Sequence, residues 1–87
     1  MSNIDTQMMI RQASNVRRVA EEMNHLNSVK LLGAADTVAA VWRGDAADMF
    51  LRHNTTTRDQ IRCAVNELQR VAGEMERFAR ELESMAE

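Results

Sequence analysis

Apolar residues in the first half of the chain recur at alternating steps of three and four, the spacing of one α-helical face. The main series is Met9, Ala13, Val16, Ala20, Met23, Leu31, Ala34, Val38 and Val41, with Asn27 interrupting it. A second series lies beside it at steps of seven, and it consists of Val19, Leu26 and Gly33. Together they are wider than one partner helix needs. We therefore expect one helix over about residues 3–41 that faces both the second half and another subunit.

The second half has a stronger periodicity, which is typical of a heptad seam with two polar breaks. Its series is Ala47, Phe50, Asn54, Thr57, Ile61, Ala64, Leu68, Val71, Met75, Phe78, Leu82 and Met85. Five further residues widen the apolar surface: Leu51, Val65, Ala72, Ala79 and Ala86. The pattern predicts a second helix over about residues 45–86.

A short stretch near the midpoint separates the two patterns and predicts a turn at residues 42–44. Gly44 lies at the boundary, and Asp45 is a good N-cap because its carboxylate can accept bonds from the next free N–H groups. Asp48 adds a negative charge near the positive end of the new helix dipole. The chain is thus expected to be all-α, one domain over residues 1–87, folded as an antiparallel two-helix hairpin roughly 60 Å long.

Both arms become polar at the same height of this predicted hairpin. Folding at Arg43 brings residues 54–62 opposite residues 24–32, and the second of these segments contains Asn27, Ser28 and Lys30. One interpretation is a hydrated waist in a long rod. The other is a polar register mark at a dimer interface, since a buried Asn can select register at some loss of stability. The pattern leaves both open.

Chain length makes oligomerisation the physical expectation. A chain of 87 residues buries only about 60% of its unfolded surface, and an isolated hairpin is expected to bury less. Two hairpins that pair into a four-helix bundle would cover the excess apolar width. The expected hairpin or dimer interface comprises Val16, Val19, Ala20, Met23, Leu26, Phe50, Ile61, Leu68, Val71 and Met75.

Charge and hydropathy exclude several classes of partner. The net charge is −2, and basic residues are interspersed with acidic ones, so no nucleic-acid partner is expected. No segment approaches the roughly 20 apolar residues of a membrane span, and no stable membrane insertion is expected. Residues 1–6 lack the basic and apolar regions of a cleavable signal peptide.

The residues that could perform chemistry do not converge. His25 and His53 fall at different heights of the hairpin, and neither has a carboxylate or cysteine at the spacing of a helical metal pair. Cys63 is the single cysteine and cannot form an intrachain disulfide. A two-helix rod also offers no concave pocket. We expect no catalytic residues, no metal site, no cofactor and no enzymatic activity.

The turn resembles the WXG family, small helical-hairpin proteins exported by type VII secretion systems. The motif is Trp42 and Gly44 between two helices, followed by the small residues Ala46 and Ala47 and the aromatic Phe50. The resemblance extends to the length of the chain and to the midpoint position of the motif. It implies a secreted dimer, and it implies that Trp42 and Gly44 form a recognition surface that meets a secretion signal. Trp42 is also expected to close the hairpin end as an apolar cap.

The C-terminal part departs from that family. Many type VII substrates carry Tyr-Xaa-Xaa-Xaa-Asp/Glu after the second helix, and this chain has no tyrosine. The nearest match is a degenerate export-signal region in which Phe78 is followed by Leu82, with Glu81 and Glu83 on either side. The departure implies one of two alternatives. Either this region is a degenerate export signal, or a partner supplies the signal.

Two functional hypotheses follow. The first is a secreted substrate or interaction protein that pairs with itself, with a second WXG-like protein or with a helical region of a toxin, and that contacts the type VII machinery. The second is a cytoplasmic helical adaptor or targeting chaperone that pairs with an effector and stays inside the cell. A membrane-active amphipathic hairpin is disfavoured by the mixed charges on the polar face, where a basic excess would be expected.

Overall fold

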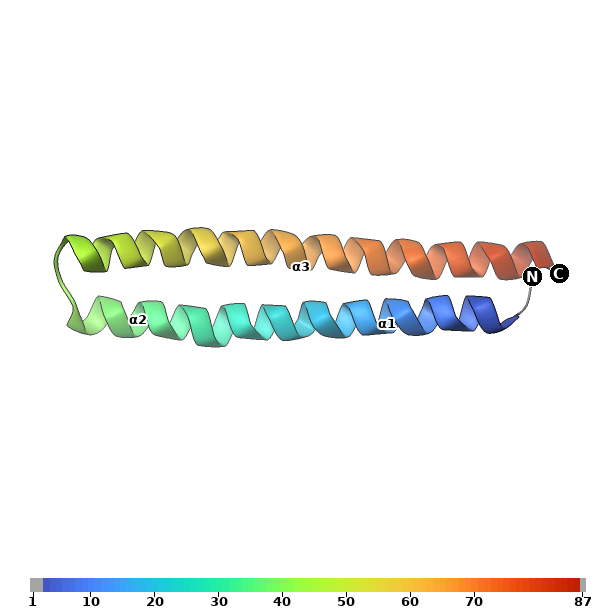
Figure 1. Ribbon diagram of the computed structural model, residues 1–87, viewed down its shortest axis with the longest axis horizontal. Coiled ribbons are helices and arrows are strands. Elements are labelled where there is room, and N and C mark those ends of the chain that lie inside the picture. Colours follow the sequence, from blue (N-terminus) through green and yellow to red (C-terminus); the bar gives the residue numbers. More distant parts are fainter. Residues whose placement is uncertain (1–2, 87) are drawn as a thin grey trace.

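The computed structural model describes the backbone of residues 3–86 and the side chains of residues 5–85, and it confirms the predicted all-α hairpin. The first arm contains α1 (Asn3–His25), a π-helical segment η1 (Leu26–Leu31) and α2 (Leu32–Val41). The second arm is the single long helix α3 (Asp45–Ala86). The arms run antiparallel, and the start of α1 and the end of α3 lie side by side, opposite the turn (Figure 1).

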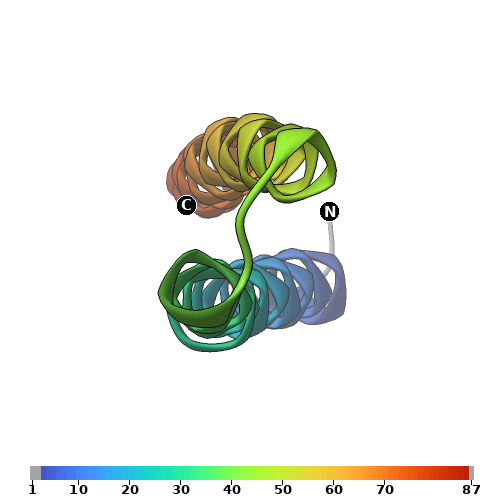
Figure 2. The ribbon, with the colours of Figure 1, turned by 90° about the vertical axis from the view of Figure 1, so that its left-hand side faces the viewer.

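The hairpin is a thin rod rather than a compact domain. Its principal extents are 65 × 15 × 11 Å. The radius of gyration is 19.3 Å, whereas a compact domain of this length would have about 12 Å. Viewed from the turn end, the arms lie side by side and are inclined to one another along the rod (Figure 2). A rod this thin leaves much of each helix without a partner.

Small side chains form the contact between the two arms. The buried residues of the first arm are Thr6, Ala13, Ala20, Asn27 and Ala35. Those of the second arm are Ala47, Asn54, Val65, Ala72 and Ala79. We call these ten residues the seam. Most follow one another at steps of seven, the spacing that keeps one helix facing another. No large side chain is fully buried among the described residues.

The seam predicted for the second arm is wrong beyond the waist. Val65, Ala72 and Ala79 are buried there, although the periodicity assigns them only to the margin of the apolar surface. Leu68 and Met75, which the periodicity places at the centre of the seam, are half-buried, and Phe78 is 53% exposed. Alanine allows the helix backbones to approach closely, and larger residues then lie to one side of the contact. The side chain of Ala86 lies outside the described part.

The first arm is not one uninterrupted α-helix. The seam advances by seven residues from Ala13 to Ala20 and from Ala20 to Asn27, but by eight from Asn27 to Ala35. The π-helical segment η1 spans this interval and accommodates the extra residue. Ala35 is therefore buried, whereas Ala34, which the apolar series places on the inner face, is exposed.

The turn is built by Gly44, whose φ of 104° lies in the region that favours glycine. Its carbonyl accepts the first hydrogen bond of α3, from the Asp48 N–H at 3.1 Å. Gly44 thus occupies the cap position expected for Asp45, and Asp45 is the first residue of the helix. Arg43 donates from Nη1 to the Ala39 carbonyl at 2.9 Å and to the Trp42 carbonyl at 2.8 Å. These bonds satisfy carbonyls that the end of α2 leaves free.

Candidate protein-interaction surface

The hairpin has two unlike faces, one on each side of the seam. Successive α-helical residues are about 100° apart around the axis, so positions three and four after a buried residue lie on opposite sides of it. Arg17 and Glu76 each lie four positions after a buried alanine, and their side chains form an ion pair. Their side of the seam is the polar face, so residues three positions after a buried one gather on the opposite side.

The polar face joins the arms through charged and hydroxyl groups. Arg17 donates two hydrogen bonds to the Glu76 carboxylate, at 3.2 Å from Nε and 2.6 Å from Nη2. These bonds lower the pKa of Glu76 and raise that of Arg17. Closer to the chain ends, Thr6 Oγ1 donates to Glu83 Oε1 at 2.9 Å. A pair of half-exposed charges contributes little to stability.

The opposite side carries the large apolar residues, and we call it the apolar face. It consists of helical residues three or six positions after a buried residue, or four or one before one. Across η1, where successive buried residues are eight apart, only the count back from Ala35 applies. Its large members are Met9, Val16, Val19, Met23, Leu26, Leu31, Val38, Val41, Phe50, Ile61, Leu68, Val71, Met75, Phe78, Leu82 and Met85. None is buried: Val19 is 42% exposed, Leu26 47% and Phe50 39%. The face thus offers a long apolar surface to a partner.

The ten residues expected at the hairpin or dimer interface divide cleanly. Ala20 is fully buried in the seam. The other nine lie on the apolar face and are half-buried or exposed: Val16, Val19, Met23, Leu26, Phe50, Ile61, Leu68, Val71 and Met75. Six of them are half-buried in the hairpin itself and three are exposed, and their role in a dimer stays a prediction. Sequence periodicity identifies this outer surface. It includes Ala13, Ala20 and Ala47 in its main series, assigns Ala72 and Ala79 to the margin, and leaves out Ala35.

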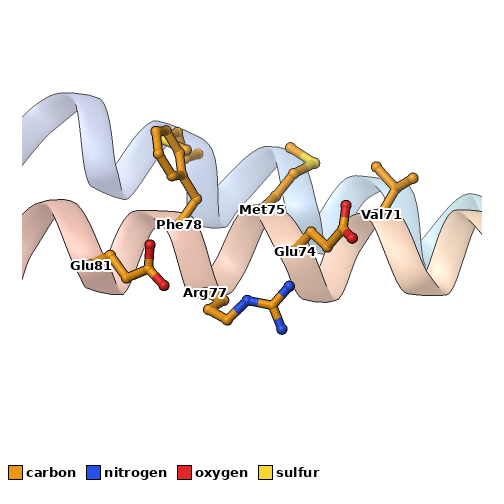
Figure 3. A pocket seen from close by; sticks show the side chains of 7 residues that line it. Val71, Glu74, Met75, Arg77, Phe78 and Glu81 are labelled. Carbon is orange, nitrogen blue, oxygen red and sulfur yellow. The ribbon is translucent and has the colours of Figure 1, made fainter.

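An open hollow of about 390 Å³ lies on the apolar face near the chain ends. Met9 of α1 lines it together with Val71, Met75 and Phe78 of α3, which confirms that these positions share one face. The three α3 side chains project to the same side of the helix (Figure 3).

Glutamate side chains form the outer rim of this hollow. Glu74, Arg77 and Glu81 also line it (Figure 3). Arg70 forms ion pairs with Glu67 and with Glu74, the latter at 2.6 Å. Its hydrogen bonds lower the pKa of Glu67, and the two carboxylates raise the pKa of Arg70. The rim is therefore partly neutralised along α3.

The four residues of the degenerate export-signal region do not form one group. Phe78 and Leu82 are on the apolar face, and Phe78 is 53% exposed. Glu81 is at the rim of the hollow. Glu83 is on the polar face, where Thr6 donates to it. The region is thus divided among three parts of the hairpin surface.

The motif residues of the turn are both accessible. Trp42 has an extended backbone after α2 and is 58% exposed, so it covers less of the hairpin end than an apolar cap would. Val41, beside it in sequence, and Met49, in the first turns of α3, are 68% and 53% exposed. Gly44 is exposed as well. This end of the rod presents apolar side chains that nothing in the described part of the chain covers.

The polar waist connects the two arms directly. Asn27 donates from Nδ2 to the Arg58 carbonyl at 3.1 Å, and Asn54 donates from Nδ2 to the Leu31 carbonyl at 2.9 Å. Arg58 in turn donates from Nε to Asn54 Oδ1 at 2.6 Å. Both asparagines are buried, each 7% exposed. They mark the register of the two arms inside the hairpin, and a similar role at a dimer interface stays a prediction.

The side chains considered for chemistry lie apart. His25, His53 and Cys63 are exposed. Within the described residues, no group of three or more His, Cys, Asp or Glu side chains is placed to hold a metal ion. None of the described helices is long and apolar enough to span a bilayer.

Comparison of the chain with protein-family models, with curated proteins and with solved structures finds no match.

Proposed function

We propose that this chain is a non-enzymatic interaction protein of a type VII secretion system, similar to WXG-family substrates, and that it acts as a dimer of hairpins. The observation that carries the proposal is the apolar face, which leaves large side chains such as Leu26 and Phe78 uncovered along the rod. A face of this kind marks a protein–protein interaction site. Pairing with another helical hairpin would bury it in a four-helix bundle.

The turn supports the family part of the proposal. A Trp-Xaa-Gly motif joins the two arms, and the positive φ of Gly44 gives its glycine a structural reason. Trp42 remains 58% exposed and can contact a partner while still ending α2. In the proposed role, Trp42 and Gly44 form the recognition surface that a secretion signal meets across the dimer.

The proposed partners are a second copy, another WXG-like protein or the helical region of a toxin, together with the secretion machinery. Neither nucleic acid nor a stably inserted membrane segment is part of the proposal. The protein would leave the cell by a route without a cleavable signal peptide.

Export is tested in the bacterium that encodes the chain. A tagged chain is followed in cells and in culture medium, in the parent strain and in a strain without the ATPase of its type VII system, with a cytosolic enzyme as the lysis control. The proposal expects the chain in the medium of the parent strain only. A chain that appears equally in both media, or in neither, contradicts export by this system.

The second candidate is a cytoplasmic adaptor or targeting chaperone. It is favoured by the placement of the export-signal residues, because Glu83 accepts a hydrogen bond from Thr6 and Phe78 belongs to the apolar face. In this candidate, the region serves the hairpin and its apolar face and carries no export signal of its own. Retention in the cell together with co-purification of a larger effector, lost in the Leu26→Lys variant, would favour this candidate.

A further inference from the structure

Three rows of residues in the first arm share the same eight-residue step at the π-helical segment. The seam steps from Asn27 to Ala35. On the apolar face, one row steps from Met23 to Leu31 and the other from Leu26 to Ala34. Elsewhere the same rows advance by seven. The extra residue in η1 (Leu26–Leu31) thus keeps the seam residues facing the second arm, and the apolar residues on one face, on both sides of the waist.

Without the π-helical segment, an uninterrupted α-helix would place different residues on the apolar face between the waist and the turn. The positions three after successive seam residues would be Lys30 and Thr37, both of which are exposed in the π-containing arm. Leu31 and Val38 occupy those positions instead, and both are half-buried. The insertion therefore replaces a charged and a polar residue by two apolar ones.

The hairpin's own contact does not need this insertion. Without it the seam would receive Ala34 in place of Ala35, which is the same residue type one position earlier. The asparagine of the opposite arm nevertheless supports the irregular turn, because Asn54 donates to the Leu31 carbonyl at 2.9 Å. The feature that distinguishes the two registers is the set of residues on the apolar face.

The apolar face carries almost no charge in the described part of the chain. Asp5, one position before the buried Thr6, lies at its end. From Met9 to Met85 the helical residues at its positions include no Asp, Glu, Lys or Arg, and His53 is the one titratable member of that stretch. A stretch without charge can pack against a copy of itself without bringing like charges together, which would otherwise disfavour the pair. The phase shift at η1 is what excludes Lys30, the only lysine of the chain, from this surface.

The exposed area matches the requirement of a dimer. The chain exposes 6329 Å², about 1,100 Å² more than the roughly 5,200 Å² expected for a compact monomer of 9.9 kDa. A stable interface of standard size buries about 800 Å² per partner. One additional hairpin is enough to remove most of the excess.

We infer that the π-helical turn is a phasing insertion that extends a self-association surface past the waist, so that a second copy of the chain is bound along both halves of the rod with Leu31 and Val38 in the contact. The inference deepens the proposed function and rests on its pairing step. In this inference, η1 determines which residues reach the apolar face. Lys30 and Thr37 then lie outside the interface.

The test compares two adjacent substitutions in the purified full chain. Val38→Lys introduces a charge on the apolar face, and Thr37→Lys introduces the same charge one residue earlier, off that face. The dimer dissociation constant is measured by sedimentation equilibrium, with helicity from circular dichroism as the folding control. We expect Val38→Lys to raise the constant about tenfold or more and Thr37→Lys to change it less than about threefold.

Three results would overturn the inference. They are a wild-type chain that stays monomeric up to about 100 μM, an equal effect of the two substitutions, or a larger effect of Thr37→Lys. Association is measured in vitro, so a dimer that forms as expected but is never exported would contradict only the proposed secretion.

Deletion of Ser28 provides a second, independent test. The deletion removes the extra residue, restores a step of seven between Asn27 and Ala35, and leaves the apolar rows in phase in an ordinary α-helix. We expect this variant to remain helical and to dimerise within about threefold of the wild type. A helical variant that no longer dimerises would show that the π turn makes the contact itself, and would overturn the phasing role.

Discussion

Asn27 and Asn54 each send a side-chain amide across the hairpin to a backbone carbonyl of the opposite arm. Asn27 donates to Arg58 at 3.1 Å, and Asn54 donates to Leu31 at 2.9 Å. The two bonds are nearly reciprocal, but the surroundings are not. Asn54 Oδ1 accepts from Arg58 Nε at 2.6 Å, whereas Asn27 Oδ1 is buried without a hydrogen-bond partner in the described part of the chain.

This asymmetry predicts unequal effects of removing each amide. Asn54→Ala breaks the bond to the π-helical turn and removes the acceptor of Arg58, so we expect a loss of about 1–3 kcal/mol in the free energy of unfolding. Asn27→Ala also removes a buried oxygen that has no partner, and we expect a clearly smaller loss. Urea unfolding at one fixed protein concentration measures both, and a larger loss for Asn27→Ala would contradict the geometry.

The alanine seam predicts that the hairpin tolerates large residues poorly at its centre. Ala72 is completely buried against the first arm. Ala72→Leu would force the helices apart, and we expect it to lower the free energy of unfolding by about 1–3 kcal/mol. Met75→Leu, three residues later on the apolar face, changes shape at nearly constant volume and is the matched control. Equal thermal midpoints for the two variants would mean that residue 72 is not in a tight contact.

The two arms and the turn are predictable from the sequence because proline is absent and Gly44 lies between two strongly periodic segments. The polar waist is visible as well, because residues 24–32 and 54–62, which contain Asn27 and Asn54, fall opposite each other. The reciprocal hydrogen bonds are not predictable, since they depend on the exact register of the arms. Folding the chain at Arg43 places residues at equal distances before and after Arg43 opposite each other. The Asn54–Leu31 pair lies within one residue of that register.

Two features of the structure are not predicted from the sequence: the buried alanines of the second arm and the π-helical turn of the first. Ala72 and Ala79 carry little apolar surface, so the larger Leu68 and Met75 dominate the periodicity although they lie beside the contact. In the first arm, the gap from Met23 to Leu31 resembles a simple interruption by Asn27. A gap of eight where seven is expected is nevertheless the signature of one inserted residue, so the spacing of the apolar residues contains the signal for the π-helical turn.

Two of the glycines predict opposite effects of the same substitution. Gly33 is within a helix, and an added Cβ would meet no atom within 4 Å in the hairpin. Gly33→Ala should raise the free energy of unfolding by about 0.5–1 kcal/mol because it restricts the unfolded chain. Gly44→Ala should lower it by about 1–2 kcal/mol, since φ is 104°. Thermal unfolding of both variants at equal concentration measures the difference, and effects of the same sign would contradict the turn geometry.

The ion pair between Arg17 and Glu76 predicts that the free energy of unfolding falls at low pH. Its hydrogen bonds lower the pKa of Glu76 below the ordinary value of 4.5, so the folded state binds this proton less readily than the unfolded state. The contribution of the pair is therefore complete above pH 4.5 and disappears as the pH falls through the lower pKa of the folded state. Arg17 is charged in both states over this range, and its raised pKa adds nothing to the dependence.

Glu76→Gln isolates this contribution. The variant should be less stable than the wild type at pH 7, and the difference between their thermal midpoints should shrink as the pH falls from about 5 towards about 2. Glu22→Gln is the matched control, because Glu22 is exposed and has no ion pair within the described residues, so we expect its difference from the wild type to stay nearly constant. A Glu76→Gln difference that persists unchanged at the acid end of this range would mean that the carboxylate acts through packing rather than through its charge.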